Sequence, residues 1–233
     1  MSTSIFTLED INFSYQDGKA VLENVNFSLH EKEKIALTGH NGSGKTTLLH
    51  LIMGLLHPVS GQVLYRGRPM QCEKDFRELR KGVGLLFQQA DDQLFCPTVI
   101  EDVAFGPLNL GKTPEEALEI SEKTLCMFGL SGYNDRVAYR LSGGEKKLVS
   151  LAAGMAMQPQ ALVLDEPTND LDPAMRNKLI NVLNALDIAM LVVSHDLDFL
   201  KHVTEAEYSC RDNSLFKGSS DFHSRQNLKD CKT

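Results

Sequence analysis

The chain has 233 residues, of which 42% are hydrophobic and 24% charged, enough to form the core of one large α/β domain or two small ones. Glycine and proline are not enriched, which argues against disordered and fibrous classes. The formal net charge of −7 argues against a main role in gripping nucleic acid, because that role needs a cationic surface, although a local basic patch stays open.

The cysteines and the apolar runs indicate the cellular compartment and whether the chain itself spans a membrane. Five widely spread cysteines, without a CxxC pair, stand at Cys72, Cys96, Cys126, Cys210 and Cys231. This pattern predicts free thiols in a reducing compartment rather than a disulfide framework or a zinc site. The N-terminus lacks the features of a signal peptide, and no apolar run approaches the roughly 20 residues that span a bilayer. If the chain works at a membrane, other chains must supply the spanning part.

The first 30 residues carry short alternating apolar stretches at 5–8, 11–13 and 25–29, with a turn at 16–19. Alternation of this kind predicts antiparallel strands with one solvated face. Continuous apolar runs follow at residues 35–38, 83–87, 161–164 and 190–193. Such runs are typical of parallel strands buried on both faces, and helical stretches lie between them. The sequence therefore predicts an α/β core with an open parallel sheet.

Residues 89–145 differ from this core and predict a mostly helical insertion. Thr113 is a helix N-cap, Pro114 stands in the first turn and Glu116 at the third position. This helix is expected to end near Gly129. From about residue 205 the tail is polar and weakly patterned; a short hairpin is open there, and no function is assigned to it.

A phosphate-binding loop of the form GxxxxGK[ST] occupies residues 39–46, between an apolar strand and a helix expected to start near Lys45. Its glycines let main-chain N–H groups close around a β-phosphate, and the helix N-terminus adds the positive end of its dipole. Lys45 is expected to reach the β- and γ-phosphates, and the Thr46 hydroxyl to ligate Mg²⁺. The alternative is a simple glycine-rich turn, which the strand-to-helix context disfavours.

The apolar run at 161–164 ends in two acids, at the edge of a parallel sheet where ligands collect. Asp165 is placed to hold Mg²⁺ through water, and Glu166 to polarise an attacking water. A solvated acidic turn is the alternative. The phosphate loop upstream favours the functional interpretation.

Residues 141–147 predict a second anion site. Ser142 and Glu145 can form a capping box, which would by itself be a purely structural feature. Gly143 and Gly144, however, expose N–H groups at a helix N-terminus. Within one chain, the phosphate loop and this second anion site cannot easily contact the same nucleotide. In two chains arranged head to tail, the phosphate loop of one chain and the second site of the other can.

These motifs, in this order, resemble the ABC ATPase family over nearly the whole chain. The matching positions are the adenine-stacking Tyr15, the phosphate loop 39–47, the Q-loop Gln88, the signature 141–145, the strand-end Asp165 and Glu166, the D-loop 170–172 and the switch residue His195. The resemblance implies one ABC ATPase domain over residues 1–233. Within it an antiparallel β subdomain is expected at about 1–30, a helical subdomain at about 89–145 and a short tail at about 205–233.

As the resemblance implies, two such domains sandwich two MgATP molecules. The residues expected to bind the nucleotide are Tyr15, Gly39, His40, Asn41, Gly42, Ser43, Gly44, Lys45, Thr46, Thr47, Ser142, Gly143 and Gly144. Those expected to hold Mg²⁺ are Thr46, Gln88 and Asp165. The catalytic groups are expected to be Glu166, His195, Gln88 and Lys45.

A finer resemblance is to the ATPases of energy-coupling-factor importers, which take up vitamins or the metals cobalt and nickel. Residues 91–95, 98–99, 101–107 and 110–111 carry it, in the segment after Gln88 where the family docks its membrane subunit. It implies a peripheral protein on the cytoplasmic face of the cell membrane, with a transmembrane scaffold and a membrane subunit that binds the solute. Cobalt, nickel and biotin are the expected solutes. A homodimer is favoured because Glu166 and the signature are both intact.

One departure from this group is Leu148, which stands where an Arg is common and leaves the geometry near the interface open. The main alternative is a soluble ABC ATPase that acts on ribosome or DNA complexes, but such proteins usually carry two ATPase domains or long coiled-coil insertions. A P-loop small-molecule kinase is a further alternative, which would have no use for residues 142–144 or for His195.

Overall fold

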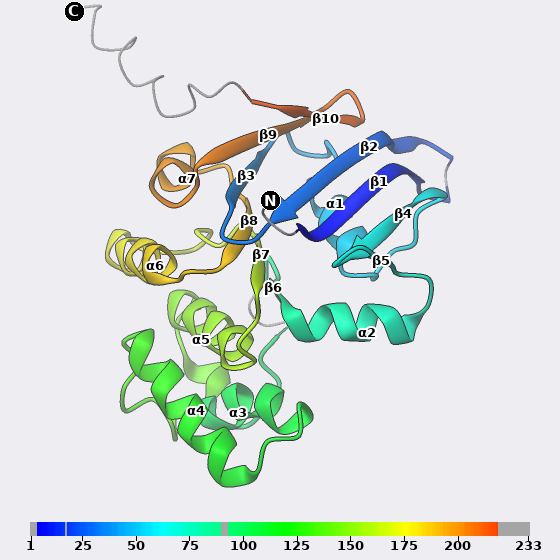
Figure 1. Ribbon diagram of the computed structural model, residues 1–233. Coiled ribbons are helices and arrows are strands. Elements are labelled where there is room, and N and C mark those ends of the chain that lie inside the picture. Colours follow the sequence, from blue (N-terminus) through cyan, green and yellow to red (C-terminus); the bar gives the residue numbers. More distant parts are fainter. Residues whose placement is uncertain (1–3, 17, 90–92, 219–233) are drawn as a thin grey trace, which may run out of the picture. The chain divides into compact units, whose positions relative to one another are not determined.

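The computed structural model describes residues 4–16, 18–89 and 93–218 (Figure 1). The predicted motif residues 91 and 92, Ala90 before them and the end of the tail from residue 219 lie outside this part. The chain divides into two compact units. The first unit comprises Met1–Phe76 and Ala189–Thr233, and the second comprises Arg77–Ile188.

An antiparallel sheet occupies the N-terminal part of the first unit. Its strands run in the order β2-β1-β4-β5 and are β1 (Ser4–Ser14), β2 (Ala20–His30), β4 (Ser60–Tyr65) and β5 (Arg68–Pro69). Phe6 pairs with Leu29 and Leu8 with Phe27, and all four side chains are buried. The alternating pattern therefore predicted β1 and β2 correctly. It did not predict β4, which pairs with the other edge of β1, or β5, which pairs with β4.

The second half of the first unit is a sheet built around the strand that leads into the phosphate loop. The strands, in the order β10-β9-β3-β8, are β10 (Ser214–Lys217), β9 (Ala206–Arg211), β3 (Lys34–Thr38) and β8 (Ala189–Val193). β3 is parallel to both β8 and β9, and every residue of β8 is buried, as the continuous apolar run predicts. β9 and β10 form an antiparallel hairpin, so the feature left open for the tail is present. The helices of this unit are α1 (Lys45–Ile52) and α7 (Leu197–Val203).

The second unit combines two parallel strands with a group of helices. β6 (Val83–Leu86) and β7 (Ala161–Asp165) pair in parallel. The helices are α3 (Val99–Asn109), α4 (Pro114–Met127), the 3-10 turn η2 (Ala138–Arg140), α5 (Gly143–Ala156) and α6 (Pro173–Ala185). α3 packs against both α4 and α5. α4 begins behind the Thr113 capping box, and Gly129 follows its end with φ +62°, as the sequence predicted.

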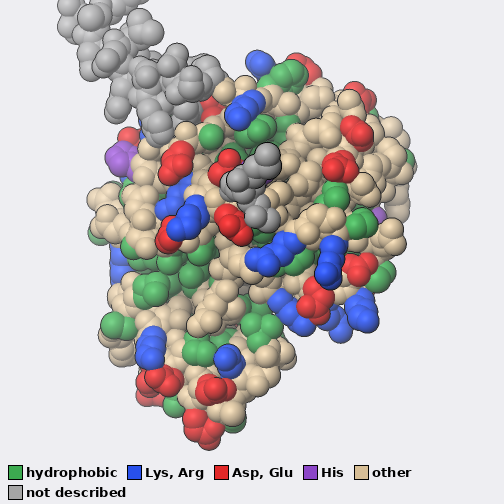
Figure 2. Space-filling model, in the orientation of Figure 1, with side chains coloured by type: hydrophobic (Ala, Val, Ile, Leu, Met, Phe, Trp, Pro, Cys, Tyr) green, Lys and Arg blue, Asp and Glu red, His purple; other side chains and the backbone are tan. Residues whose placement is uncertain are grey.

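The division between the units falls within α2 (Glu73–Gly82). Figure 2 shows Lys and Arg side chains gathered over this helix, which is the local basic patch that the acidic composition left open. Its basic residues are Lys74, Arg77, Arg80 and Lys81, and its acidic residues are Glu73, Asp75 and Glu78. The two signs are nearly balanced along the helix, so it presents a mixed-charge surface. Within the described residues, no helix is both long and apolar enough to cross a membrane.

Candidate nucleotide site

The phosphate loop joins β3 to α1 within the first unit, and two of its glycines are required by the backbone. Gly39 has φ +149°, and a Cβ there would lie 2.4 Å from the carbonyl oxygen of Cys210. Gly44 is the N-cap of α1 with φ +97°, in the left-handed region that favours glycine. Substitution at either position would force the loop off the adjacent strand or distort the start of the helix. The loop is therefore shaped by its main chain, which is the part that contacts a phosphate.

The side chain of Lys45 folds back onto the phosphate loop and contacts its main chain. Its side chain is only 7% exposed, and Nζ donates to the carbonyl oxygens of Gly39 (2.8 Å) and His40 (3.0 Å). Ser43 Oγ is buried and has no hydrogen-bond partner in the described part of the chain. A buried hydroxyl without an acceptor, next to a buried ammonium at a helix N-terminus, fits a phosphate group well. These side chains therefore suit the nucleotide that the motif predicted.

Cys210 contacts the phosphate loop from the neighbouring strand β9. The sequence analysis did not identify this residue as part of the site. β9 pairs with β3, and the thiol of Cys210 donates to the carbonyl oxygen of Ser43 at 2.7 Å. Burial raises the pKa of this thiol, while its hydrogen bond to Ser43 and the charge of Lys45 lower it less strongly. The thiol therefore keeps the proton that it donates. No local pattern could have revealed this contact, because 167 residues separate its partners.

Tyr15 is held beside the helix that follows the phosphate loop. Its hydroxyl and Thr47 Oγ1 form a hydrogen bond of 3.0 Å, and its ring contacts Phe13 edge-to-face with 5.0 Å between centroids. The side chain is still 48% exposed. A ring that is oriented but exposed is suited to stacking on a base. The structure thus brings together two residues that the sequence assigned to nucleotide binding.

His195 reaches the same edge of the sheet as the phosphate loop. Leu37 of β3 pairs with Val193 of β8, so the two parallel strands end side by side. The loop begins after the first strand and His195 follows the second, and its side chain is exposed. Ligands collect at this carboxyl edge of parallel strands.

In the second unit, β6 and β7 end side by side in the same way. Leu86 pairs with Leu164, so Gln88 and the acids Asp165 and Glu166 follow neighbouring strand ends. The two acids are buried at 5% and 6% exposure. Glu166 also has φ +48°, a left-handed conformation that costs a residue with a side chain about 1 kcal/mol or more. Burial and backbone strain of an acid at a strand end are typical of a functional position.

The signature residues lie at the N-terminus of α5, as predicted. The Ser142 hydroxyl accepts from the Glu145 N–H, and the Glu145 carboxylate accepts from the Ser142 N–H at 2.8 Å. Tyr133 then donates from its hydroxyl to the same carboxylate at 2.6 Å, and the Arg136 guanidinium lies over the Tyr133 ring. The hydrogen bond from Tyr133 is the main reason that the pKa of Glu145 is lowered. Ser142 and Gly143 remain exposed at the N-terminus of α5, which these hydrogen bonds stabilise.

A cavity of about 340 Å³ lies within the second unit beside these residues. It collects parts of three predicted motifs, the Q-loop, the signature and the D-loop. Its lining residues are Gln88, Gln89, Gly143, Lys146, Lys147, Asn169 and Asp170. The predicted residues thus divide between the units: Tyr15, the phosphate loop and His195 in the first, and Gln88, the signature, Asp165 and Glu166 in the second.

Lys147 is the second residue that the sequence reasoning missed. It is 4% exposed, and its Nζ donates to the carbonyl oxygens of Gln88 (2.6 Å) and Glu166 (3.3 Å). Burial lowers the pKa of its ammonium group, and the nearby carboxylates oppose that shift. A signal was present, because the spacing of residues 144, 147, 148, 151 and 152 marks the buried face of the helix and puts a lysine on it.

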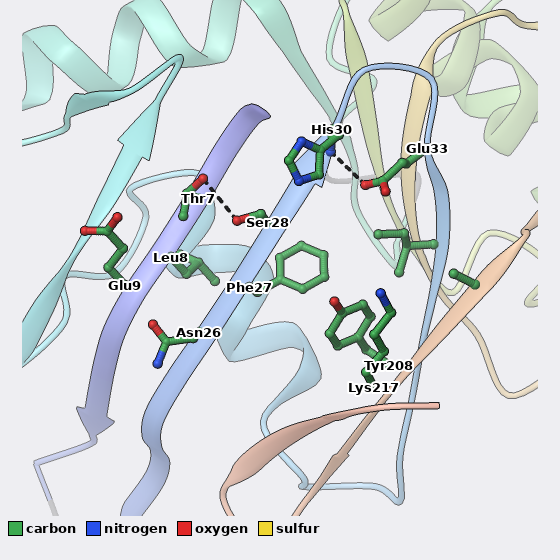
Figure 3. Close-up of a pocket in the computed structure, with 12 residues that line it drawn as sticks. Thr7, Leu8, Glu9, Asn26, Phe27, Ser28, His30, Glu33, Tyr208 and Lys217 are labelled. Atoms are coloured by element: carbon green, nitrogen blue, oxygen red, sulfur yellow. Dashed lines mark hydrogen bonds between the residues drawn. The ribbon is translucent and has the colours of Figure 1, made fainter. Parts of the chain in front are cut away.

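A larger cavity of about 440 Å³ belongs to the first unit and contains none of the predicted residues. Figure 3 shows it between strands β1 and β2 on one side and β9 and β10 on the other. Phe27 and Tyr208 meet there edge-to-face with their ring centroids 5.0 Å apart, and the Glu33 carboxylate accepts from the His30 N–H. The cavity is therefore separate from the predicted nucleotide residues.

Comparison with known proteins decides the family. Residues 22–169 match the family model described as ABC transporter. The chain belongs to this family. A Nitratidesulfovibrio vulgaris protein with the provisional name ABC transporter ATP-binding protein is 55% identical over 197 residues, which are 84% of this chain and 72% of the relative. An energy-coupling factor transporter ATP-binding protein, EcfA, from Methanocaldococcus jannaschii is 42% identical over 217 residues, 91% of this chain and 78% of the relative.

Two solved structures extend the likeness of this ABC ATPase to its fold. The first is cbiO1 from Clostridium perfringens, described as part of the ABC transporter complex cbiONQ, with a TM-score of 0.86 and 30% identity over 96% of this chain and 92% of that one. The second is a dimeric ATP-binding cassette in a post-hydrolysis state with ADP and Pi, with a TM-score of 0.81 and 26% identity over 91% and 98%. The ABC ATPase fold, the resemblance to energy-coupling-factor ATPases and the assignment as an ATPase are confirmed.

The structure also locates the departure at Leu148 within this ABC ATPase. Its side chain is fully buried on the face of α5 that carries Leu151 and Ala152. An aliphatic side chain packs there without the hydrogen bonds that a buried guanidinium would need. The change from the Arg common in the group is thus accommodated in the core of the second unit.

Proposed function

We propose that this ABC ATPase is the energy-supplying subunit of an energy-coupling-factor type importer. One observation carries the pairing of two copies: a single chain holds two separate helix N-termini of the kind that binds anions, at Lys45 and at Ser142. Two copies arranged head to tail place the phosphate loop of one copy against the exposed signature of the other. Two identical copies suffice, because each supplies both halves.

Within each nucleotide site, the residues divide the chemistry of phosphoryl transfer. Lys45 and the loop N–H groups hold the β- and γ-phosphates, Tyr15 stacks on the adenine, and His195 contacts the γ-phosphate. Glu166 orients or deprotonates the attacking water. Gln88 responds to the γ-phosphate and passes the change to the membrane partner.

The same site is expected to use Mg²⁺, which would neutralise charge that develops on the phosphate oxygens. The Thr46 hydroxyl, Gln88 and Asp165 would hold it. The donor set fits, because Mg²⁺ prefers a few oxygen ligands from the protein together with phosphate oxygens.

The second unit also has a surface suited to a membrane subunit. Phe95 and Phe105 are 65% and 46% exposed, with their rings edge-to-face and 4.8 Å between centroids. Leu108, three residues after Phe105 on α3, is exposed as well. The Asp102 carboxylate accepts from the N–H groups of Phe95 and Cys96 at 3.0 and 2.9 Å, which fixes the segment that presents the first ring. Exposed aromatic side chains on a rigid backbone are typical of an interaction surface.

The complete assembly is therefore expected on the cytoplasmic face of the cell membrane, with a transmembrane scaffold and a membrane subunit that binds the solute. The 42% identity to a named energy-coupling-factor ATPase supports this class. The solute is expected to be cobalt, nickel or a vitamin such as biotin. The ATPase itself does not select it.

Co-purification from native membranes tests the proposal. The tagged protein should bring along a small polytopic scaffold and a substrate-binding membrane protein, identified by mass spectrometry. Phe105→Ser should lose both partners, because it removes half of the exposed aromatic pair, while keeping ATPase activity. Leu118→Ser is the matched control, since Leu118 is equally exposed on α4. Recovery of ribosomal or DNA-repair proteins instead would overturn the importer and favour the soluble alternative.

A further inference from the structure

Lys147 is a buried cation at the junction of three segments of the second unit. It projects from the first turns of α5, five residues after Ser142. Its Nζ is 2.6 Å from the Gln88 carbonyl oxygen and 3.3 Å from the Glu166 carbonyl oxygen. One ammonium group thus links the signature helix to the segments that follow β6 and β7.

The surroundings of this ammonium group explain why a charge is tolerated there. A buried lysine is costly unless hydrogen bonds and opposite charges compensate for the lost water. Two of its three protons are given to main-chain carbonyls, and the carboxylates of Asp165, Glu166 and Asp170 act on it electrostatically. The group also lines the cavity that collects the Q-loop, signature and D-loop residues.

The acceptors are main-chain atoms, so Lys147 fixes where the backbone runs rather than how one side chain points. At Glu166 this backbone has the left-handed φ of +48°, a conformation that needs support from its neighbours. At Gln88 the strand has already ended, and no sheet pairing continues to define the path of the chain. Removing the ammonium group would leave the carbonyl of the buried Glu166, and that of Gln88, without this donor.

We propose that Lys147 is a positioning residue for ATP hydrolysis. It holds the backbone of Gln88 and of Glu166 at fixed positions relative to the signature helix α5. This inference rests on the catalytic roles proposed above for those two residues. Lys147 itself does not contact the nucleotide. It acts through the geometry of the groups that do.

Steady-state kinetics of the purified protein test this role. Lys147→Met keeps the length of the side chain and removes its donor. The kcat for ATP should fall about 10- to 100-fold, because a displacement of about 1 Å at the reacting groups has an effect of this size. ATP affinity, measured with a fluorescent analogue, should change less than twofold, since the phosphate loop is untouched. Lys147→Arg, which keeps a cationic donor, should restore part of kcat.

Lys178→Met is the matched control. Lys178 also belongs to the second unit and donates to a main-chain carbonyl, that of Gly129 at 2.9 Å, but no site residue is involved. It should leave kcat within twofold of the original protein. A lowered melting temperature in both variants with unchanged kcat would mean that each lysine only stabilises the fold, and would overturn the proposal.

Glu166→Gln, run in the same assay, separates failure of this inference from failure of the proposed function. If that variant hydrolyses ATP normally, the catalytic assignment itself is wrong. If it is inactive while Lys147→Met is fully active, only the positioning role fails. Should Lys147→Met not fold, Lys147→Gln keeps one amide donor and decides the question by the same split between kcat and ATP affinity.

Discussion

Glu166 unites burial, a negative charge and a left-handed backbone in one residue. Each of these features is unfavourable for folding, and together they require a surrounding structure that compensates for them. Lys147 provides one compensation through the Glu166 carbonyl. A residue maintained at such a cost is expected to serve the reaction, and its side chain can be tested without altering its shape.

Glu166→Gln should lower the turnover of ATP by roughly 10²- to 10⁴-fold, the range expected for the loss of a general base. ATP binding should persist, because the amide replaces a carboxylate of the same size and the phosphate loop is unchanged. Single-turnover kinetics and nucleotide titration measure the two effects separately. Glu115→Gln, on the exposed first turn of α4, is the control, and near-normal turnover in Glu166→Gln would contradict the assignment.

At the residue scale, sequence reasoning found those positions whose chemistry is encoded locally. The phosphate loop and the acids at 165 and 166 are recognisable because the neighbouring residues determine their strand-to-loop context. Cys210 and Lys147 were missed because their partners are distant in the chain. Lys147 nevertheless lies on the apolar face of its helix, and this position in the sequence indicates that a charged side chain is buried there.

At the scale of elements, α5 begins where the capping box predicted, but the box is only part of its stabilisation. Tyr133, twelve residues before Glu145, donates a hydrogen bond to the capping carboxylate. The continuous apolar runs predicted β7 and β8 correctly, since both are buried throughout, whereas β6 is buried only at Val83 and Leu86. The hairpin of β4 and β5 was missed because its residues are largely exposed, apart from Val63. Its place in the sheet is set by pairing with β1, some 50 residues away.

Tyr133→Phe should destabilise the protein by about 1 kcal/mol at neutral pH, the usual value of one hydrogen bond. The pKa of Glu145 is lowered by this bond, so its contribution is present above the unfolded pKa of 4.5 and is lost as pH falls through the folded value. The pKa of Tyr133 is raised, so the contribution is also lost when the phenol ionises above its ordinary pKa of 10.0.

Thermal melts of the original protein and Tyr133→Phe should therefore differ between about pH 5 and pH 9 and converge at both extremes. Tyr139→Phe provides the control, because that side chain is 72% exposed in the 3-10 turn just before the signature. A difference between the original protein and Tyr133→Phe that is independent of pH would show that the phenol acts by packing alone.

For the whole molecule, the two units each contain an incomplete set of nucleotide residues. The phosphate loop belongs to the first unit and the signature to the second, and the proposed head-to-tail pair uses both. The single-domain description of residues 1–233 stays a prediction. No local pattern could have placed this division inside α2, because it depends on which contacts the folded chain makes.

The proposed pairing predicts a nucleotide-dependent dimer. Glu166→Gln with ATP should elute at twice the chain mass of 25.9 kDa, and as a monomer without nucleotide. Adding Gly143→Asp should abolish the dimer, because a carboxylate at the exposed start of α5 repels the γ-phosphate of the other copy. A Cβ at Gly143 meets nothing closer than 3.8 Å, so the fold should accept this change. Light scattering after size-exclusion chromatography measures the masses.

Ala174→Asp is the matched control for this experiment, since it places an acid in the exposed first turn of α6. It should leave the dimer intact. If the dimer survives Gly143→Asp as well, the signature does not face a nucleotide, and the head-to-tail arrangement is wrong.

The position of β3 between β8 and β9 has a consequence for synthesis of the protein. β3 is made early, at Lys34–Thr38, yet its two neighbours come from Ala189–Val193 and Ala206–Arg211. The thiol that supports the phosphate loop, Cys210, is also made at this late point. Because domains form cooperatively only when their strands are available, the loop acquires its support only after residue 211 has left the ribosome. A nascent chain that has not yet released β9 therefore lacks both the strand beside β3 and the thiol that donates to the phosphate loop.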